Sequence, residues 1–138
     1  EAMSHAALLS GLALANSGLG MAHGVAAVLG AICDVPHGLA CAVMLPAAMR
    51  FNRPGREPQL AKLAEAGLGR SFTSDSAALS QAIDEISATL GIPRRLGELG
   101  VRAEQLPAIV EGSRGNSLSG NPRPVSPEEL RELLEAML

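Results

Sequence analysis

The chain contains no tryptophan and no tyrosine, and only two phenylalanines among its 138 residues. Its apolar content is nevertheless 47%, so any core must be built from alanine, leucine, valine, isoleucine and methionine. Those residues favour helices as a group, whereas strands usually draw on tyrosine, phenylalanine, threonine and tryptophan. We find no strand pattern and no internal repeat, so the composition predicts an all-α fold. The length predicts one domain, residues 1–138.

Basic clusters are also missing. The 11 lysines and arginines are outnumbered by 14 acidic residues, which leaves a net charge of −3. A nucleic-acid partner requires clustered Lys and Arg to neutralise phosphates, and single-stranded bases require aromatic side chains for stacking. The sequence therefore argues against a nucleic-acid partner.

Cysteine is scarce, with Cys33 and Cys41 as the only two. They lie eight residues apart, and neither belongs to a CxxC pair. A disulfide framework would need more cysteines, and a zinc knuckle would need such a pair. We expect both thiols to be reduced and the protein to be cytoplasmic.

Charge is almost absent from the first fifty residues, where Asp34 is the only charged residue between Glu1 and Arg50. The uncharged run 6–33 is long enough to cross a bilayer. It contains polar residues and five glycines, however, and it lacks an aromatic belt, a basic flank and the basic start of a signal peptide. A small membrane hairpin is therefore the least favoured alternative. The chain also starts at Glu1 inside an expected helix, which suggests that an N-terminal part is absent.

Apolar spacing, glycines and prolines divide the chain into helices. Thr73, Ser74 and Asp75 are candidate N-caps for the fifth of them, and Ser126 to Glu129 form a capping box for the last. Residues 113–124 are expected to form a loop without a pattern of its own. The expected helices are 2–17, 21–32, 37–50, 60–67, 76–90, 103–111 and a last one that ends at Leu138.

Two of the three histidines, His23 and His37, lie in the apolar stretch, and each is followed by glycine. A buried imidazole needs a polar partner, and imidazole is the commonest metal ligand. The residues alone leave two interpretations open: two hydrogen-bonded core histidines, or half of a metal site. The third histidine, His5, is expected at a surface or in helix packing. Asp34 is expected to form a turn, with a contact to the histidines as the alternative.

Several short motifs share a characteristic order and spacing. They are GLGMAHG at 18–24, LGA at 29–31, PHG at 36–38, LP at 45–46, RFN at 50–52, LGELGV at 96–101 and NPRP at 121–124, the last followed by the capped helix. In residue type and spacing they resemble the signature of the iron-containing alcohol dehydrogenases (group III, with a dehydroquinate-synthase-like fold). The resemblance covers essentially the whole chain.

This resemblance implies a two-domain enzyme that interconverts small alcohols and aldehydes by hydride transfer. Its N-terminal α/β domain binds NAD or NADP, and its all-α C-terminal domain holds Fe(II), or in some members Zn(II), with one Asp and three His. Two of those histidines match His23 and His37, while the other ligands lie upstream of Glu1. The chain is therefore expected to be the distal part of the metal domain and to be inactive alone. We assign no catalytic residue and no cofactor-binding residue within it, because no GxGxxG motif follows a strand.

The sequence departs from the family pattern at two places. Ala27 stands where many relatives carry a second histidine, and Cys41 stands where relatives often have asparagine. We expect Cys41 to act mainly as a small packing residue, because buried cysteine usually behaves so.

Other features of the chain leave a non-catalytic interpretation open. Its apolar first fifty residues could form the interface of a helical oligomerisation module, so the expected partner is either a second copy or the missing N-terminal part. The polar residues of the late loop, Arg114, Asn116, Asn121 and Arg123, are expected to be solvated, with a structural role as the alternative. Gly24 and Gly38 could serve helix packing or substrate access equally.

Overall fold

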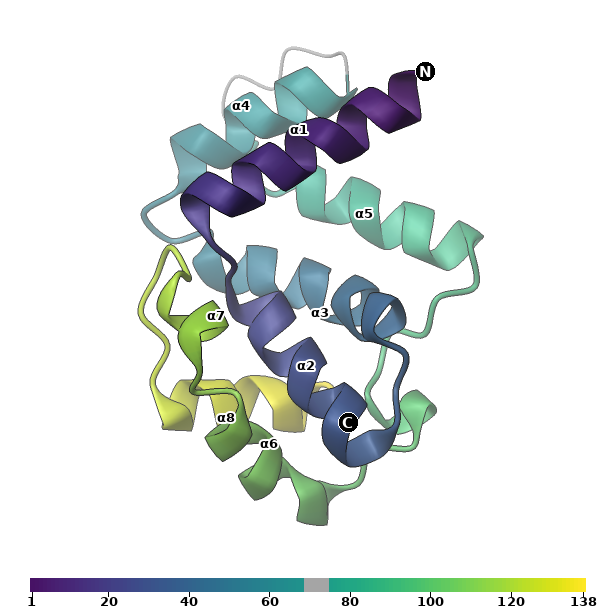
Figure 1. Cartoon of the computed structure of the whole chain (residues 1–138), viewed down its shortest axis with the longest axis vertical. Helices are drawn as coiled ribbons and strands as arrows, with labels where there is room; N and C mark the ends of the chain where they lie inside the picture. The colour runs from purple at the N-terminus through teal and green to yellow at the C-terminus, as the bar shows by residue number, and fades with distance from the viewer. Residues whose placement is uncertain (69–74) are drawn as a thin grey trace.

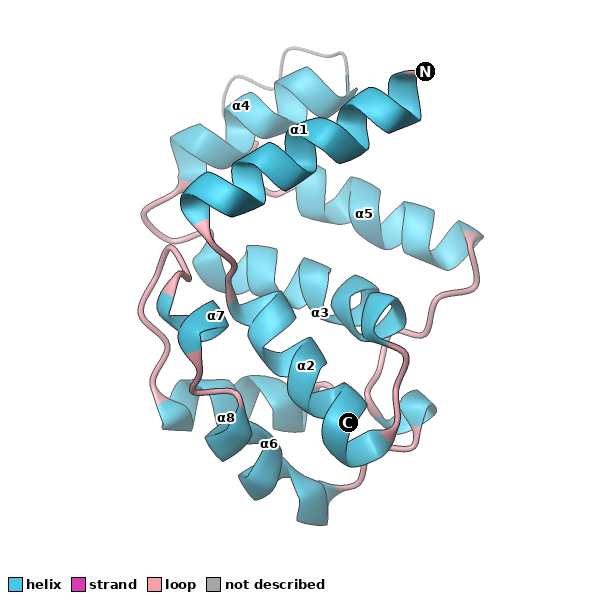
Figure 2. Cartoon of the chain, viewed as in Figure 1, coloured by secondary structure: helices cyan, strands magenta, loops and turns pink. Residues whose placement is uncertain are grey.

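A computed structural model describes residues 1–68 and 75–138, and within those ranges it contains helices, turns and loops but no strand (Figures 1 and 2). The expected all-α class is confirmed. Two of the expected cap residues, Thr73 and Ser74, lie outside the described residues. The helices in chain order are α1 (Ala2–Ser17), α2 (Met21–Cys33), α3 (His37–Asn52), α4 (Glu57–Leu68), α5 (Ala78–Thr89), α6 (Leu106–Gly112), α7 (Asn116–Ser119) and α8 (Pro127–Ala136). Two short 3₁₀ turns, η1 (Gly97–Leu99) and η2 (Ala103–Gln105), precede α6.

Most helix boundaries fall within a few residues of those expected, with two differences of kind. The expected helix 103–111 is divided into the 3₁₀ turn η2 and the helix α6, with Pro107 in the first turn of α6. The expected patternless loop contains the short helix α7, which lies between Gly115 and Gly120. A helix of four residues is too short for apolar periodicity to reveal it.

The core surrounds α2, which lies at the centre of Figure 1. This helix packs against α3 on one side and against α6 and α7 on others, while α8 packs on α6. All buried core side chains are of the five types expected from composition, and they are Met21, Val25, Ala26, Leu29, Val35, Ala40, Val43, Met44, Ala48, Leu96, Val101, Leu106, Ile109, Val110, Leu130 and Leu134. The core thus holds α2 and α3, the helices that carry His23 and His37.

The expected capping box at the start of α8 is present. The Ser126 hydroxyl accepts a hydrogen bond from the Glu129 backbone N–H at 3.1 Å, and the Glu129 carboxylate accepts one from the Ser126 N–H at 3.0 Å. With Pro127 as the first helical residue, this fixes where α8 begins.

Apolar side chains are exposed on α1 and α5. No residue of α1 is buried, and Met3 and Leu9 are 82% and 64% exposed. On α5 the expected apolar stripe is only half covered, since Leu90 is 69% exposed whereas the small residues Ser80 and Ser87 are buried.

The uncharged run 6–33 is divided between two helices. Among the described residues, no single helix has both the length and the apolar character to cross a bilayer. The helices α1 and α2 reach that length only as a pair, and they are bent by 98° at the break between them.

Candidate metal centre

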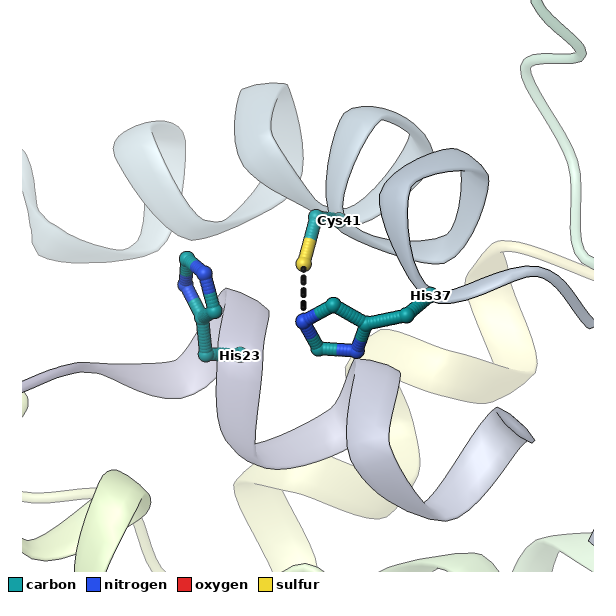
Figure 3. Close-up of side chains that lie close together, drawn as sticks. All are labelled: His23, His37 and Cys41. Carbon is teal, nitrogen blue, oxygen red and sulfur yellow. Dashed lines mark hydrogen bonds between the residues drawn. The ribbon is translucent and has the colours of Figure 1, made fainter. Parts of the chain in front are cut away.

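Two neighbouring helices bring the two motif histidines together. His23 lies in the first turn of α2, and His37 is the first residue of α3, directly after the extended residue Pro36. Their ring centroids are 5.5 Å apart, with the ring planes inclined at 54° (Figure 3). His23 is half-buried and His37 is exposed. The two imidazoles therefore face one small volume at the edge of the α2–α3 contact.

A thiol completes this group. Cys41 follows His37 by one helical turn, so both side chains lie on the same face of α3. Its Sγ lies 3.5 Å from His37 Nε2 (Figure 3). One ligating atom from each of His23, His37 and Cys41 can be chosen so that all three lie within 4.8 Å of one another. Cys41 also packs against the core, as expected, so packing and contact with the histidine coexist.

Burial determines the proton affinity of the thiol. Desolvation raises the pKa of Cys41, because the thiolate loses hydration when it is partly covered. In the absence of a cation the thiol is thus protonated at neutral pH. A coordinated divalent ion reverses this preference, since it deprotonates a thiol that binds it.

The other candidate ligands lie elsewhere. Asp34 adopts a left-handed conformation at φ 55° as the C-cap of α2, and it is exposed, so the turn-forming expectation describes it. His5 is exposed on α1. Within the described residues, the group of converging ligand atoms includes neither of them and contains no carboxylate.

Asn121 holds the start of α2 from a distance of 100 residues in the sequence. Gly20, the N-cap of α2, has no side chain to cap the helix, and the Oδ1 atom of Asn121 accepts the hydrogen bond of the Met21 N–H at 3.0 Å. A Cβ atom at Gly20 would lie 3.0 Å from the same oxygen, so the glycine makes room for this approach. The cap lies two residues before His23 and therefore fixes the first turn that carries it.

The same asparagine also ties the late loop to the end of α3. The Nδ2 of Asn121 donates to Asn52 Oδ1 and to the Arg123 carbonyl, both at 2.7 Å. In return, Asn52 Nδ2 donates to Asn121 Oδ1 at 3.1 Å. The terminal asparagine of the RFN motif and the first residue of NPRP are thus one paired unit. Both residues belong to motifs that the sequence analysis identified, but nothing in the spacing of the motifs predicts that the two side chains form a pair.

Arg123 strengthens this junction. Its guanidinium lies over the Phe51 ring at 4.1 Å from the centroid, donates to the Phe51 carbonyl at 3.2 Å, and pairs with Glu129 of α8. The expectation of a solvated loop is therefore wrong for Asn121 and Arg123, because both are partly buried and bonded to other elements. Arg114 pairs with Glu111 at 3.2 Å on the surface.

The glycines beside the two histidines have different surroundings. Gly24 is buried, and a Cβ there would lie 3.4 Å from the Leu118 N atom and 3.5 Å from the Ser113 carbonyl oxygen, so this glycine serves close packing. A Cβ at Gly38 would meet nothing within 4 Å. Space beside His37 is therefore open. Ala27, one turn after His23, is exposed.

The chain matches a known protein family. A model described as "Fe-containing alcohol dehydrogenase family, C-terminal" matches residues 1–138. The chain is 39% identical over 140 residues to a 1,3-propanediol dehydrogenase of Citrobacter freundii, covering 96% of this chain and 36% of that protein. It also resembles a solved 1,3-propanediol oxidoreductase, with a TM-score of 0.88, 32% identity, and coverage of 99% of this chain and 37% of the other.

A further solved structure shares the fold. It is a sulfoacetaldehyde reductase from Bifidobacterium kashiwanohense in complex with NAD+, with a TM-score of 0.70, 26% identity, and coverage of 86% of this chain and 30% of the other. The chain spans about a third of the length of the curated relatives it matches. Its sequence and its fold both place it in the iron-containing alcohol dehydrogenase family, and the model of the family's C-terminal part matches all of residues 1–138.

Proposed function

We propose that the chain is the metal-binding part of an NAD(P)-linked, metal-dependent alcohol dehydrogenase, and that His23 and His37 are two of the metal ligands. The observation that carries the proposal is the convergence of the two imidazoles, 5.5 Å apart, from the two motifs that identify the family. Fe(II) is the ion we expect, with Zn(II) as the alternative. We further propose that residues 1–138 form one domain, because one continuous core joins α2, α3, α6 and α8.

The donor set at this position fits a divalent transition ion. Imidazole nitrogens suit iron and zinc, and three nitrogen or sulfur donors converge here from two rigid helices. When bound, the ion supplies Lewis-acid chemistry, which polarises an alcohol or carbonyl oxygen. The substrates we propose are small alcohols and aldehydes, in line with the names of the relatives.

The residues of this chain position the ligands and leave room beside them. The Asn121 cap and the packing of Gly24 hold the first turn of α2, from which the His23 side chain projects. Pro36, with its fixed backbone, leads into His37, and the open space at Gly38 leaves one side of that ring accessible. The nicotinamide cofactor, NAD or NADP, is expected to bind outside this chain. The two free thiols agree with a reducing, cytoplasmic compartment.

Calorimetric titration of the chain with Zn(II), and with Fe(II) under anaerobic conditions, tests the site. The site lacks the ligands that we expect upstream of Glu1, so we expect weak binding and little or no dehydrogenase turnover by the chain alone. His23→Ala and His37→Ala should each lower the affinity by at least about tenfold. His5→Ala is the matched control, because His5 is exposed on α1 and should leave the affinity unchanged. Equal binding by all three variants would contradict the proposal.

A second candidate function is helical association. The exposed apolar side chains of α1 favour it, since contiguous apolar surface marks sites of contact. Sedimentation equilibrium separates the two: a metal-free oligomer supports the association module, whereas a monomer that binds the ion supports the metal site.

A further inference from the structure

The sulfur of Cys41 is placed for more than packing. His37 and Cys41 stand at positions i and i+4 of α3, the spacing by which helices present two metal ligands on one face. The third donor, His23, comes from α2, the helix packed directly against α3. The thiol therefore lies within a converging donor set supplied by two elements that the core holds in place.

The distances agree with a shared ion. With zinc–sulfur and zinc–nitrogen bonds of about 2.3 and 2.05 Å and a tetrahedral angle, neighbouring sulfur and nitrogen ligands are separated by roughly 3.6 Å. Cys41 Sγ and His37 Nε2 are 3.5 Å apart. The upper limit of 4.8 Å among all three ligand atoms leaves only a small adjustment of the side chains to reach bonding distance.

We infer that Cys41 is a metal ligand, and that this chain offers a His–His–Cys donor set to a divalent transition ion with an affinity for sulfur. The inference rests on the proposed function, because the ion is the one held by His23 and His37. On binding, the Cys41 S–H bond breaks, its proton passes to solvent, and the sulfur lone pair forms the bond to the ion. No redox change occurs in either partner.

This donor set has two chemical consequences. The three donors of this chain fill three positions around the ion and leave room for the ligands that we expect upstream of Glu1. A thiolate also shifts the preference of the site toward Zn(II) and Co(II) and away from Mn(II), which favours oxygen ligands. We expect Cys41→Ser to lower the affinity for Zn(II) by at least about tenfold and to change the affinity for Mn(II) by less than about threefold.

Cobalt spectroscopy of the 138-residue chain tests the inference directly. Co(II) bound to a thiolate shows a near-ultraviolet sulfur-to-metal charge-transfer band, whereas Co(II) bound only by nitrogen and oxygen shows visible d–d bands without it. We expect the charge-transfer band in the wild type and in Cys33→Ser, and its loss in Cys41→Ser. Cys33 is the matched control, because it is also half-buried and lies outside the group of donors.

A second measurement leaves Cys41 unaltered. In Cys33→Ser the only remaining thiol is Cys41, and saturating Zn(II) should slow its alkylation by at least about tenfold, since a coordinated thiolate is a poor nucleophile. His37→Ala in the same background should abolish this protection. The protection does not depend on the folding of a Cys41 variant.

The outcomes separate this inference from the proposed function. Visible cobalt bands that disappear in His23→Ala, without any charge-transfer band or zinc protection, would leave the histidine site in place and overturn the role of Cys41. A charge-transfer band that persists in Cys41→Ser would also overturn it. No binding of cobalt or zinc at any concentration would overturn both.

Discussion

Replacing Asn121 by alanine should loosen the start of α2, because this one side chain makes four hydrogen bonds. It caps the Met21 N–H, pairs twice with Asn52, and donates to the Arg123 carbonyl. Alanine removes all four contacts and adds none. Met21 is completely buried, so its N–H is left in a region with poor access to water.

The magnitude follows from the groups that lose their partner. An unpaired buried donor or acceptor costs about 1–3 kcal/mol, and groups with access to water cost less. The Met21 N–H belongs to the first class, whereas the Asn52 amide and the Arg123 carbonyl are partly exposed. We therefore expect Asn121→Ala to lower the free energy of unfolding by about 2–4 kcal/mol. For a chain of this length that corresponds to a fall in Tm of roughly 6–15 °C.

Urea and thermal denaturation followed by far-ultraviolet circular dichroism measure this effect. Asn16→Ala is the matched control, because Asn16 makes one exposed hydrogen bond, to the Leu12 carbonyl in α1, and its loss should cost less than about 0.5 kcal/mol. The double variant Asn52→Ala/Asn121→Ala should cost less than the sum of the two single changes, with a coupling energy of about 0.5–3 kcal/mol. Equal effects of Asn121→Ala and Asn16→Ala would refute this account of how α2 is held.

The remaining predictions concern one glycine and one thiol. A Cβ atom at Gly120 would overlap the Leu19 carbonyl oxygen, so Gly120→Ala should lower the free energy of unfolding by about 1–3 kcal/mol in chemical denaturation. Gly115→Ala is the control and should be tolerated, because a Cβ there would meet open space. Equal stability of the two variants would contradict the close approach at Gly120. Desolvation raises the pKa of Cys33, and the nearby charge of Arg102 lowers it. In a Cys41→Ser background, Cys33 should therefore react slowly with iodoacetamide at pH 7, and its rate should rise about tenfold per pH unit until the raised pKa is reached. Arg102→Ala should slow the reaction further, because it removes the charge that lowers this pKa. A rate that does not depend on pH would contradict this.

Composition and local pattern account for the fold class and for most of the helices. A core almost without aromatics favours helices, and the side chains of the hydrophobic core are of the five types that the composition left available. The capping box at Ser126 could be predicted from the sequence because both of its hydrogen bonds join residues three apart. Capping boxes and helices depend on residues close together in the sequence, so local spacing predicts them.

Long-range polar contacts could not be predicted in the same way. The N-cap of α2 is a glycine, so its local sequence contains no capping side chain, and the cap comes from Asn121 at the far end of the chain. Likewise, the apolar stripe of α5 predicts burial, yet Leu90 at its C-cap remains exposed while Ser80 and Ser87 are buried. Tertiary packing decides which face of an amphipathic helix is covered, and periodicity alone does not supply that information.

The proposed donor role of Cys41 could be predicted from the sequence only in part. Its spacing of four from His37 places both side chains on one face of a helix, and this follows from helical geometry alone. The decisive fact is the position of the third donor, His23, which depends on how α2 crosses α3. Packing and coordination are not exclusive for a cysteine at the rim of a core, so the expectation of a packing residue described only one of its contacts.

The helices α1 and α2 differ in how far the rest of the chain holds them in place. The apolar side chains of α1 lie on all sides, a pattern typical of buried helices, yet none of its residues is buried. An isolated helix of 16 residues is only marginally stable in water, so we expect α1 to need contacts with another surface. By contrast, α2 is held by α3, α6, α7 and the Asn121 cap, and it makes no extensive contact with α1. The geometry of His23, His37 and Cys41 therefore does not depend on whatever covers α1, so a metal site and an association surface can coexist in one chain.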